Sequence, residues 1–341
     1  MRKLFVTGGA GFIGSAFVRL VLESDPTTEV VNFDALTYAG NLDNLQGLDS
    51  IRYKFVRGDI ADPQVVLAAL DTQTDAIINF AAESHVDRSI ISAAEFLRTI
   101  IIGTQTLLDA ARERDVARFI QVSTDEVMGS LPENEEAYFT EDSPFAPNSP
   151  YAASKAAAEH LVRAAHHTFG LDTVITRCGN NYGPRQFPEK FLPLAISNAL
   201  ADESIPVYGD GRNVRDWIYV EDHCQAIVRA LEKGRPGGLY NIGARNERRN
   251  IDVVQSLLNA LDKPPSLIRF VKDRPGHDRR YAIDPSLVEA ELAWHPLESW
   301  ENGLQKTINW YRENTGWIER ARSGAYRDYY RQQYGEGIRA Q

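Results

Sequence analysis

Tyr151 and Lys155 are the residues whose types and spacing most directly suggest proton chemistry. They lie four positions apart in SPYAASKAAAEHLV, where Ser149 can cap a helix, Pro150 suits its first position and the alanines favour helix. Residues four apart share one helix face. A lysine ammonium near a tyrosine favours the phenolate and would lower the tyrosine pKa from about 10. The pair is a candidate base, although taken alone it is more often a solvent-facing contact.

A second polar group, Thr124, Asp125 and Glu126, follows an apolar stretch that reads as a strand. Two adjacent carboxylates in one site repel each other, so their titrations should separate. One carboxyl would stay protonated while the other ionises, which supplies the general acid and the general base that an elimination of water requires. The structural alternative is that Thr124 or Asp125 caps the next turn and Glu126 is solvated.

The glycine-rich loop TGGAGFIG, at residues 7–14, lies between a predicted strand and a predicted helix. Glycine lets the backbone approach a pyrophosphate closely, and the helix start offers N–H groups to phosphates. Asp34 ends the next predicted strand, where a carboxylate can bind ribose hydroxyls and repels a 2′-phosphate, which favours NAD over NADP. Because the spacing is G-x-x-G-x-x-G, an ordinary capped turn with Asp34 as a turn acid is the alternative.

The scaffold that must position these residues follows from the apolar pattern. The sequence predicts strands at 4–6, 29–33, 51–56, 76–80, 116–123 and 173–177, and helices at 12–23, 63–70, 93–112 and 150–169. This alternation predicts an α/β fold, a doubly wound parallel sheet of the Rossmann type. Residues 1–179 would form the NAD-binding domain, to which about 216–243 return. Residues 180–330 would form a second, smaller domain that binds the substrate.

Composition excludes several classes of protein. The chain has 341 residues, of which 43% are hydrophobic and 25% charged, as in ordinary globular proteins. A net charge of −10 argues against nucleic acid or an anionic membrane as partner. No apolar stretch reaches the ~18 residues of a membrane span, and the first apolar run is too short for a signal peptide. Cys178 and Cys224 have no metal-site spacing, so we expect no metal and a soluble, cytoplasmic protein.

Seven stretches of the chain resemble the dTDP-glucose 4,6-dehydratase family of the extended short-chain dehydrogenase/reductase superfamily. They are FAAESHVDRSI, VSTDEV, SPYAASKAAAEHLV, TRCGNNYGPRQFPEKFLP, RDWIYVEDHC, YNIG and DRPGHDRRYAID. The resemblance implies an NAD-dependent lyase that converts dTDP-glucose to dTDP-4-keto-6-deoxyglucose by internal hydride transfer through tightly bound NAD. It also implies a homodimer formed through the helices near 93–112 and 150–169. One departure is Met128, where the family usually has tyrosine.

The resemblance assigns a role to each matching residue. Tyr151, assisted by Lys155 and Thr124, would remove the C4 hydroxyl proton. Glu126 would take the C5 proton, and Asp125 would protonate the departing C6 hydroxyl. Together with the motifs above, it places the cofactor on Gly8, Gly11, Phe12, Ile13, Gly14, Asp34, Thr37, Asp59, Ile60, Ala81, Ala82, Ser84, Thr99, Tyr151, Lys155 and Asn181. It places the substrate on Ser84, Thr124, Asn180, Lys190, Phe191, Pro206, Tyr208, Arg215, Asn250, Asp273, Arg274 and His277.

An anionic sugar nucleotide needs local positive charge in an acidic chain. Residues 269–280 hold five Lys or Arg against two Asp, and Lys190, Arg212 and Arg215 precede them. Arginine suits bidentate phosphate contact and lysine a point contact. The sequence leaves several alternatives open: a 4,6-dehydratase acting on UDP- or CDP-glucose, a 4-epimerase or decarboxylase, and a non-catalytic NAD-sensing regulator. It does not indicate the downstream pathway.

Overall fold

A parallel sheet forms the centre of the molecule. The structure, a computed structural model, describes residues 2–49, 51–133 and 136–322. The seven strands of this central sheet all pair in parallel, in the order β10-β6-β5-β4-β1-β2-β3. They are β1 (Lys3–Thr7), β2 (Glu29–Asp34), β3 (Tyr53–Arg57), β4 (Ala76–Asn79), β5 (Arg118–Thr124), β6 (Thr173–Cys178) and β10 (Gly238–Ile242). The α/β fold predicted from the alternating pattern is confirmed.

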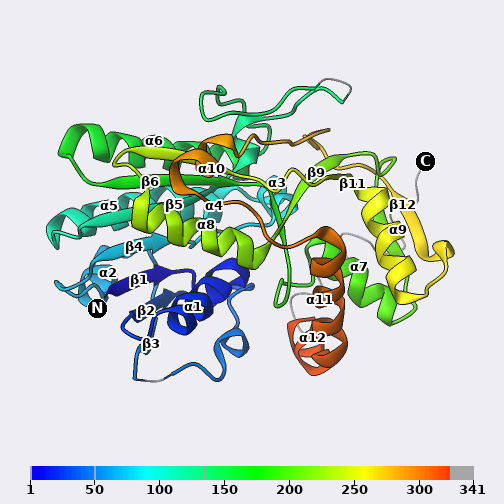
Figure 1. Cartoon of the computed structure of the whole chain (residues 1–341), viewed down its shortest axis with the longest axis horizontal. Coiled ribbons are helices and arrows are strands. Elements are labelled where there is room, and N and C mark those ends of the chain that lie inside the picture. The colour runs from blue at the N-terminus through cyan, green and yellow to red at the C-terminus, as the bar shows by residue number, and fades with distance from the viewer. Residues whose placement is uncertain (1, 50, 134–135, 323–341) are drawn as a thin grey trace.

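Helices cover both faces of this sheet. On one face α1 (Phe12–Ser24), α8 (Val220–Lys233) and α10 (Ser286–Leu292) pack in one apolar core, and Figure 1 shows α1 and α8 in front of the strands. On the other face α2 (Pro63–Ala69), α5 (Gly103–Glu113) and α6 (Pro150–Phe169) pack in a second core. Because both faces are buried, the strands are apolar nearly throughout rather than alternating.

The remaining elements gather beyond the sheet, at the right of Figure 1. The strands are β7 (Asn180–Tyr182), β9 (Val214–Tyr219) and β11 (Glu247–Arg249) in one small sheet, and β8 (Ile205–Tyr208) with β12 (Ile268–Val271) in another. The helices are α7 (Phe191–Leu200), α9 (Asn250–Leu261), α11 (Trp300–Glu313) and α12 (Thr315–Ala321). They enclose a core of their own, in which Tyr182, Trp217 and Trp300 pack with ring centroids 5.0–6.3 Å apart.

The helix predicted over 93–112 is not regular. The short α4 (Ala94–Phe96) leads into a π-helical segment, η2 (Leu97–Ile102), before α5 begins. A π-helical turn changes which side chains face inward, and here Ile100 is buried while Ile102 is 55% exposed. An additional short helix, α3 (Val86–Ile91), which the sequence analysis did not predict, precedes it.

The chain returns to the first sheet after leaving it. Helix α8 packs against α1, and β10 pairs with β6. In addition, α10 packs against α8 and β10, and Trp294 belongs to the same apolar core, although the sequence analysis assigned both to the second domain. The boundaries of the two domains stay a prediction, and residues 323–330 of the second lie outside the described residues.

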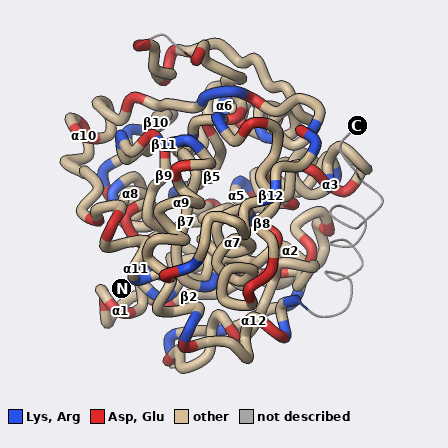
Figure 2. Tube along the Cα trace, turned by 90° about the vertical axis from the view of Figure 1, so that its right-hand side faces the viewer, with Lys and Arg blue, Asp and Glu red and all other residues tan. Residues whose placement is uncertain are grey.

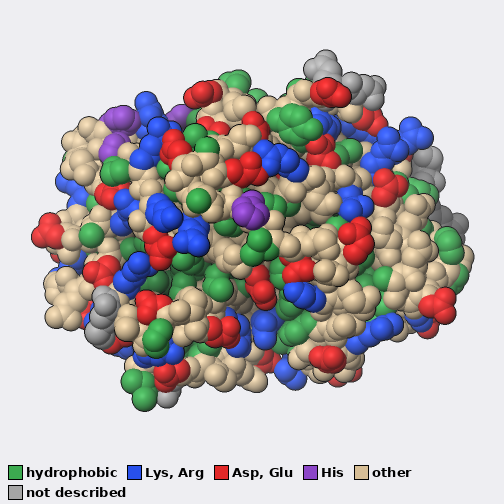
Figure 3. Space-filling model, viewed as in Figure 1, with side chains coloured by type: hydrophobic (Ala, Val, Ile, Leu, Met, Phe, Trp, Pro, Cys, Tyr) green, Lys and Arg blue, Asp and Glu red, His purple; other side chains and the backbone are tan. Residues whose placement is uncertain are grey.

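Acidic and basic residues are interspersed along the Cα trace (Figure 2), and their side chains are mixed over the face drawn in Figure 3. Among the helices described, none combines the length and the apolar composition needed to cross a membrane.

Candidate active site

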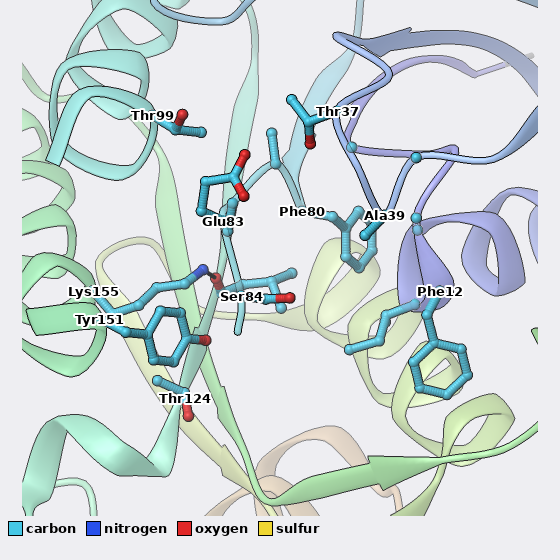
Figure 4. Close-up of a pocket in the computed structure, with 18 of the residues that line it drawn as sticks. Phe12, Thr37, Ala39, Phe80, Glu83, Ser84, Thr99, Thr124, Tyr151 and Lys155 are labelled. Atoms are coloured by element: carbon cyan, nitrogen blue, oxygen red, sulfur yellow. Dashed lines mark hydrogen bonds between the residues drawn. The ribbon is translucent and has the colours of Figure 1, made fainter. Parts of the chain in front are cut away.

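A cavity of about 350 Å³ lies at the carboxyl ends of the central strands. Its lining includes the loops after β1 and β4, the neighbouring strands at which the strand order reverses, where doubly wound sheets bind their ligands. Figure 4 shows part of its lining. All of the predicted cofactor and catalytic residues line it, as do four predicted substrate residues, Ser84, Thr124, Asn180 and Lys190.

The glycine loop forms one end of this cavity. Gly8 has φ +70°, and a Cβ there would lie 2.6 Å from the backbone nitrogen of Ala81. A Cβ on Gly14 would lie 2.3 Å from the carbonyl oxygen of Gly8. The first bond inside α1 runs from the amide of Ser15 to the carbonyl of Gly11, 3.0 Å away. The three preceding amides of the helix start therefore have no partner within the helix and can meet a phosphate.

Asp34 lies beside the loop and is almost fully buried. Its carboxylate accepts the amide of Ala10 at 2.9 Å and the amide of Leu36 at 2.8 Å. Burial raises the pKa of Asp34, while these two bonds act in the opposite direction. A carboxylate has about four acceptor sites, so room is left for ribose hydroxyls. The backbone cradle and this acid together fit a dinucleotide.

Tyr151 and Lys155 lie near each other on α6 with Thr124 close by, as Figure 4 shows. The ammonium of Lys155 donates to the carbonyl of Val122 at 2.9 Å, and burial lowers its pKa to about 8. Burial, followed by the charge of Glu126, raises the pKa of Tyr151 well above its ordinary value. The expectation that Lys155 lowers the tyrosine pKa is therefore wrong for the protein alone, because desolvation and the adjacent acids outweigh it.

The acid pair occupies a short 3₁₀ turn, η3 (Asp125–Met128), directly after β5. Asp125 is 2% exposed, and its Oδ2 atom is buried with no hydrogen-bond partner in the part of the chain that the structure describes. Burial and then Glu126 raise the pKa of Asp125 well above its usual value. Burial also raises the pKa of Glu126, but three nearby cations oppose the shift, namely Arg274, Lys190 and Arg215. The two carboxyls thus lie in different surroundings, because the raised pKa of Asp125 is furthered by Glu126 whereas three cations oppose the rise at Glu126. That one is protonated while the other is ionised stays a prediction.

The structural alternative for Thr124 also holds. Thr124 is the N-cap of η3, and its hydroxyl accepts the amide of Glu126 at 3.3 Å. This bond orients the turn that presents both acids to the cavity. One hydroxyl therefore caps the turn and stands close to the tyrosine.

Most of the predicted substrate residues lie beyond this cavity. Two of them meet at Asp87 of α3, whose carboxylate accepts from the Tyr208 hydroxyl at 2.9 Å and pairs with the Arg274 guanidinium at 3.0 Å. The others outside its lining are Phe191, Pro206, Arg215, Asn250, Asp273 and His277. The imidazole of His277 contacts the Asp273 carboxylate at 2.6 Å.

The basic stretch 269–280 is less available for phosphate than its composition suggests. Arg279 pairs with Glu133 at 3.0 Å and Asp210 at 2.8 Å, and Arg280 pairs with Glu247 at 2.8 Å. The number of basic residues in the stretch overestimates the positive charge available to a ligand, because the fold pairs two of them with acidic side chains. Arg274 is the member of the stretch whose charge reaches Glu126.

The sequence analysis missed several residues that line the cavity. Among them are Glu83, Gln186, Phe187 and Glu189. All four lie inside the stretches FAAESHVDRSI and TRCGNNYGPRQFPEKFLP. They are close in sequence to predicted site residues such as Ser84 and Lys190, and this proximity could have indicated them. Their residue types alone did not indicate a catalytic or binding role.

Comparison with known proteins places this architecture in a family. The model of the GDP-mannose 4,6 dehydratase family matches residues 5–307. The chain is 51% identical to a dTDP-glucose 4,6-dehydratase of Xanthomonas campestris pv. campestris over 347 residues, which cover 96% of this chain and 98% of the relative. The chain therefore belongs to the family of nucleotide-sugar 4,6-dehydratases that this match defines.

Solved structures refine this assignment. A dTDP-glucose 4,6-dehydratase of Streptomyces venezuelae, crystallised with NAD and TYD bound, superposes with a TM-score of 0.91 at 49% identity, covering 94% of this chain and 99% of that one. A UDP-glucose 4-epimerase of Thermus thermophilus in complex with NAD gives 0.84 at 31% identity, covering 92% and 99%. Within the family, the similarity is thus to the dTDP-glucose 4,6-dehydratases, as the resemblance implied.

Proposed function

We propose that this protein is an NAD-dependent lyase that dehydrates dTDP-glucose to dTDP-4-keto-6-deoxyglucose. The observation that carries the proposal is the pair of carboxyls after β5, which lie in different electrostatic surroundings beside Tyr151. A neutral acid and an ionisable base at one site are what removal of water from adjacent carbons requires.

Each catalytic side chain has a separate task. Tyr151, with Thr124 beside it, takes the proton of the C4 hydroxyl, and the ammonium of Lys155 supports the phenolate. The ketone formed at C4 makes the C5 hydrogen acidic, and Glu126 removes it as a proton. Asp125 gives its proton to the C6 hydroxyl, which leaves as water. A proton then returns to C5 when the 4-keto-6-deoxy sugar forms.

In this proposal the cofactor binds the glycine loop and Asp34 at one end of the cavity and Tyr151, Lys155 and Asn181 at the other, since all of these residues line it. NAD bound there would accept a hydride from C4 and return it to C6, so no second substrate would be needed. The basic side chains Lys190, Arg215 and Arg274 hold the anionic sugar nucleotide in this proposal.

A nucleotide-sugar 4-epimerase is the second candidate, because the glycine loop and the Tyr–Lys pair are common to both reactions and an epimerase superposes well. An epimerase leaves C5 and C6 untouched and has no use for the acid pair. Similarity to dTDP-glucose dehydratases supports thymine as the base over uracil or cytosine.

The deciding experiment is incubation of the pure protein with dTDP-, UDP- and CDP-glucose in deuterated water. Dehydration of dTDP-glucose should place deuterium at C5 and yield a 6-deoxy product. A product epimerised at C4 with no deuterium at C5 would contradict the proposal. Preference for UDP- or CDP-glucose would retain the reaction and change the base.

We further propose that the protein works in the cytoplasm as a homodimer, paired through α6 and the helical segments at 94–113. Leu97 and Ile102 on these segments are 45% and 55% exposed, as an apolar pairing surface would be in a separated protomer. Light scattering should give the mass of two chains at micromolar concentration. A monomer would contradict the pairing.

A further inference from the structure

One wall of the cofactor cavity is made by three loops that are distant in the sequence. They are residues 37–40 after β2, residues 83–88, which comprise the end of the loop after β4 and the first turn of α3, and residues 186–190 after β7. Thr37, Ala39, Glu83 and Ser84 line the cavity from the first two loops, and Figure 4 labels all four. Phe187 and Glu189 line it from the third. The first two loops belong to the central sheet and the third leads into α7.

A single guanidinium joins these three loops. Arg88 donates to the Glu189 carboxylate through Nε at 3.1 Å and Nη2 at 3.0 Å. The same guanidinium lies 4.1 Å from the centre of the Tyr38 ring. Tyr38 in turn meets Phe187 edge to face, with ring centroids 5.8 Å apart. The Glu189 side chain is only 1% exposed, so this ion pair is largely shielded from water.

The third loop is also tied to groups placed at the reaction centre. Gln186 donates to the carbonyl of Asn181 at 2.9 Å, and the ammonium of Lys190 donates to the carbonyl of Ser84. The imidazole of His85 lies 3.4 Å from the carbonyl of Glu189. Residues 186–190 therefore cannot move away from the cavity without loss of several contacts at once.

The location of the ion pair gives it a consequence for the cofactor. A dinucleotide held by the glycine loop and Asp34 would run along this wall, past Thr37, Ala39 and Phe187, all of which line the cavity. Movement of residues 186–190 away from the other two segments requires that the Arg88–Glu189 pair break, which would leave a carboxylate buried without its cation. Such a loss is costly, so the pair opposes opening of the wall.

We propose that Arg88, Glu189 and Tyr38 form a latch that retains NAD through the whole catalytic cycle. The inference rests on the proposed function, in which the reduced cofactor must stay in place between the two hydride transfers. These three side chains are positioning residues: they act on the cofactor by closing the wall around it rather than by proton transfer. Loss of the latch speeds cofactor release at any stage.

The test measures release of NAD from the holoenzyme without any sugar. Protein loaded with radiolabelled NAD is diluted into excess unlabelled NAD, and the label retained is followed by rapid gel filtration. Glu189→Gln keeps the shape and removes the charge. Because a hydrogen bond to a charged group is involved, we expect release about 10- to 100-fold faster than from the wild type.

The matched control is Asp172→Asn, which alters the Arg118–Asp172 ion pair, 2.7 Å long, at the amino ends of β5 and β6. It should release NAD at the wild-type rate. Tyr38→Leu removes the ring contact without a change in buried charge and should also speed release, which covers the case that Glu189→Gln does not fold. Release from both latch variants no faster than from Asp172→Asn would overturn the proposal.

A second readout separates the latch from the reaction itself. During turnover of dTDP-glucose, Glu189→Gln should shed reduced cofactor and lose activity, and added NAD should restore it. Should the wild type not dehydrate dTDP-glucose, the release rates without sugar would still decide on the latch.

Discussion

The cofactor end of the site comes from the strand–turn–helix unit of β1 and α1 together with the end of the next strand, β2, whereas its proton-transfer end is assembled from β5, η3 and α6. At the cofactor end, binding depends mainly on backbone atoms. The glycine loop must let the backbone come close to the cofactor, and the amides at the start of α1 must be available to its phosphates. At the second end, function depends on which side chains share a buried space and how they shift each other's protonation. Local sequence can specify the first kind of site, but the second kind requires the fold.

The largest effect is expected at the proton-transfer end. Tyr151→Phe removes the oxygen that takes the proton and leaves the glycine loop intact. Turnover should fall by ~10²–10⁴-fold, the usual contribution of a general base, while NAD binding persists. Turnover can be measured with dTDP-glucose, and NAD binding by calorimetry. Near wild-type turnover would remove Tyr151 from the mechanism.

Asp125→Asn sharpens the division of labour within the same end. The variant keeps the shape but has no proton to give the C6 hydroxyl, so product formation should drop by ~10²-fold or more. In single-turnover mixing, the near-ultraviolet absorbance of reduced nicotinamide should rise and persist. If that rise is itself slow, Asp125 acts in the oxidation step. An unchanged product rate would assign protonation of the leaving water to another group.

At the cofactor end, Gly14→Ala should act through backbone crowding alone. The new Cβ would meet the carbonyl oxygen of Gly8 at 2.3 Å, so the loop must shift. We expect weaker NAD binding and a loss of about 1–3 kcal/mol in the free energy of unfolding, as for other overpacked sites. Gly47→Ala serves as a control, because a Cβ there meets no atom of the described residues within 4 Å and only its φ of +80° is strained. Equal NAD affinity in both variants would show that the close approach does not matter.

Asp34→Ala tests the same end through a side chain. Loss of the carboxylate should weaken NAD binding about tenfold, as for a hydrogen bond to a charged group, with a smaller loss for NADP. Calorimetric titration with each cofactor measures both. If the wild type binds the two cofactors equally, Asp34 does not select between them.

The smallest expected effect concerns stability and pH. The pKa of Asp125 is raised in the folded state, so between its ordinary and its raised value the folded protein binds more protons than the unfolded chain. Stability from this group is therefore present at low pH and lost as pH rises through that window. Asp125→Asn should flatten this dependence and slightly raise the Tm at neutral pH. Thermal unfolding of both proteins from pH 5 to 8 measures this dependence. If Asp125→Asn has a lower Tm than the wild type at pH 8, the ionised Asp125 carboxyl does not destabilise the fold.

Where the predicted secondary structure or domain assignment differs from the structure, the cause is packing against distant segments rather than the local sequence. The sequence predicted α6 with its observed ends, because Ser149, Pro150 and Gly170 mark its limits locally. The 93–112 segment has no such break, yet it contains a π-helical turn next to the cavity. Likewise, residues 286–294 looked like part of the second domain but complete the core under α8, since nothing in their own pattern records which surface they cover.

The sequence alone determined the parallel sheet, the glycine loop with Asp34, and the residue types at the reaction centre. Those features depend on periodicity, on backbone freedom and on spacing within single elements, all of which are local. The tertiary structure decided the protonation of Tyr151 and Asp125, the pairing of Arg279 and Arg280 with acids, and the joining of Arg88 to Glu189. These depend on burial and on charges brought together from distant segments, and electrostatic energy in a desolvated site follows distance in space rather than distance along the chain.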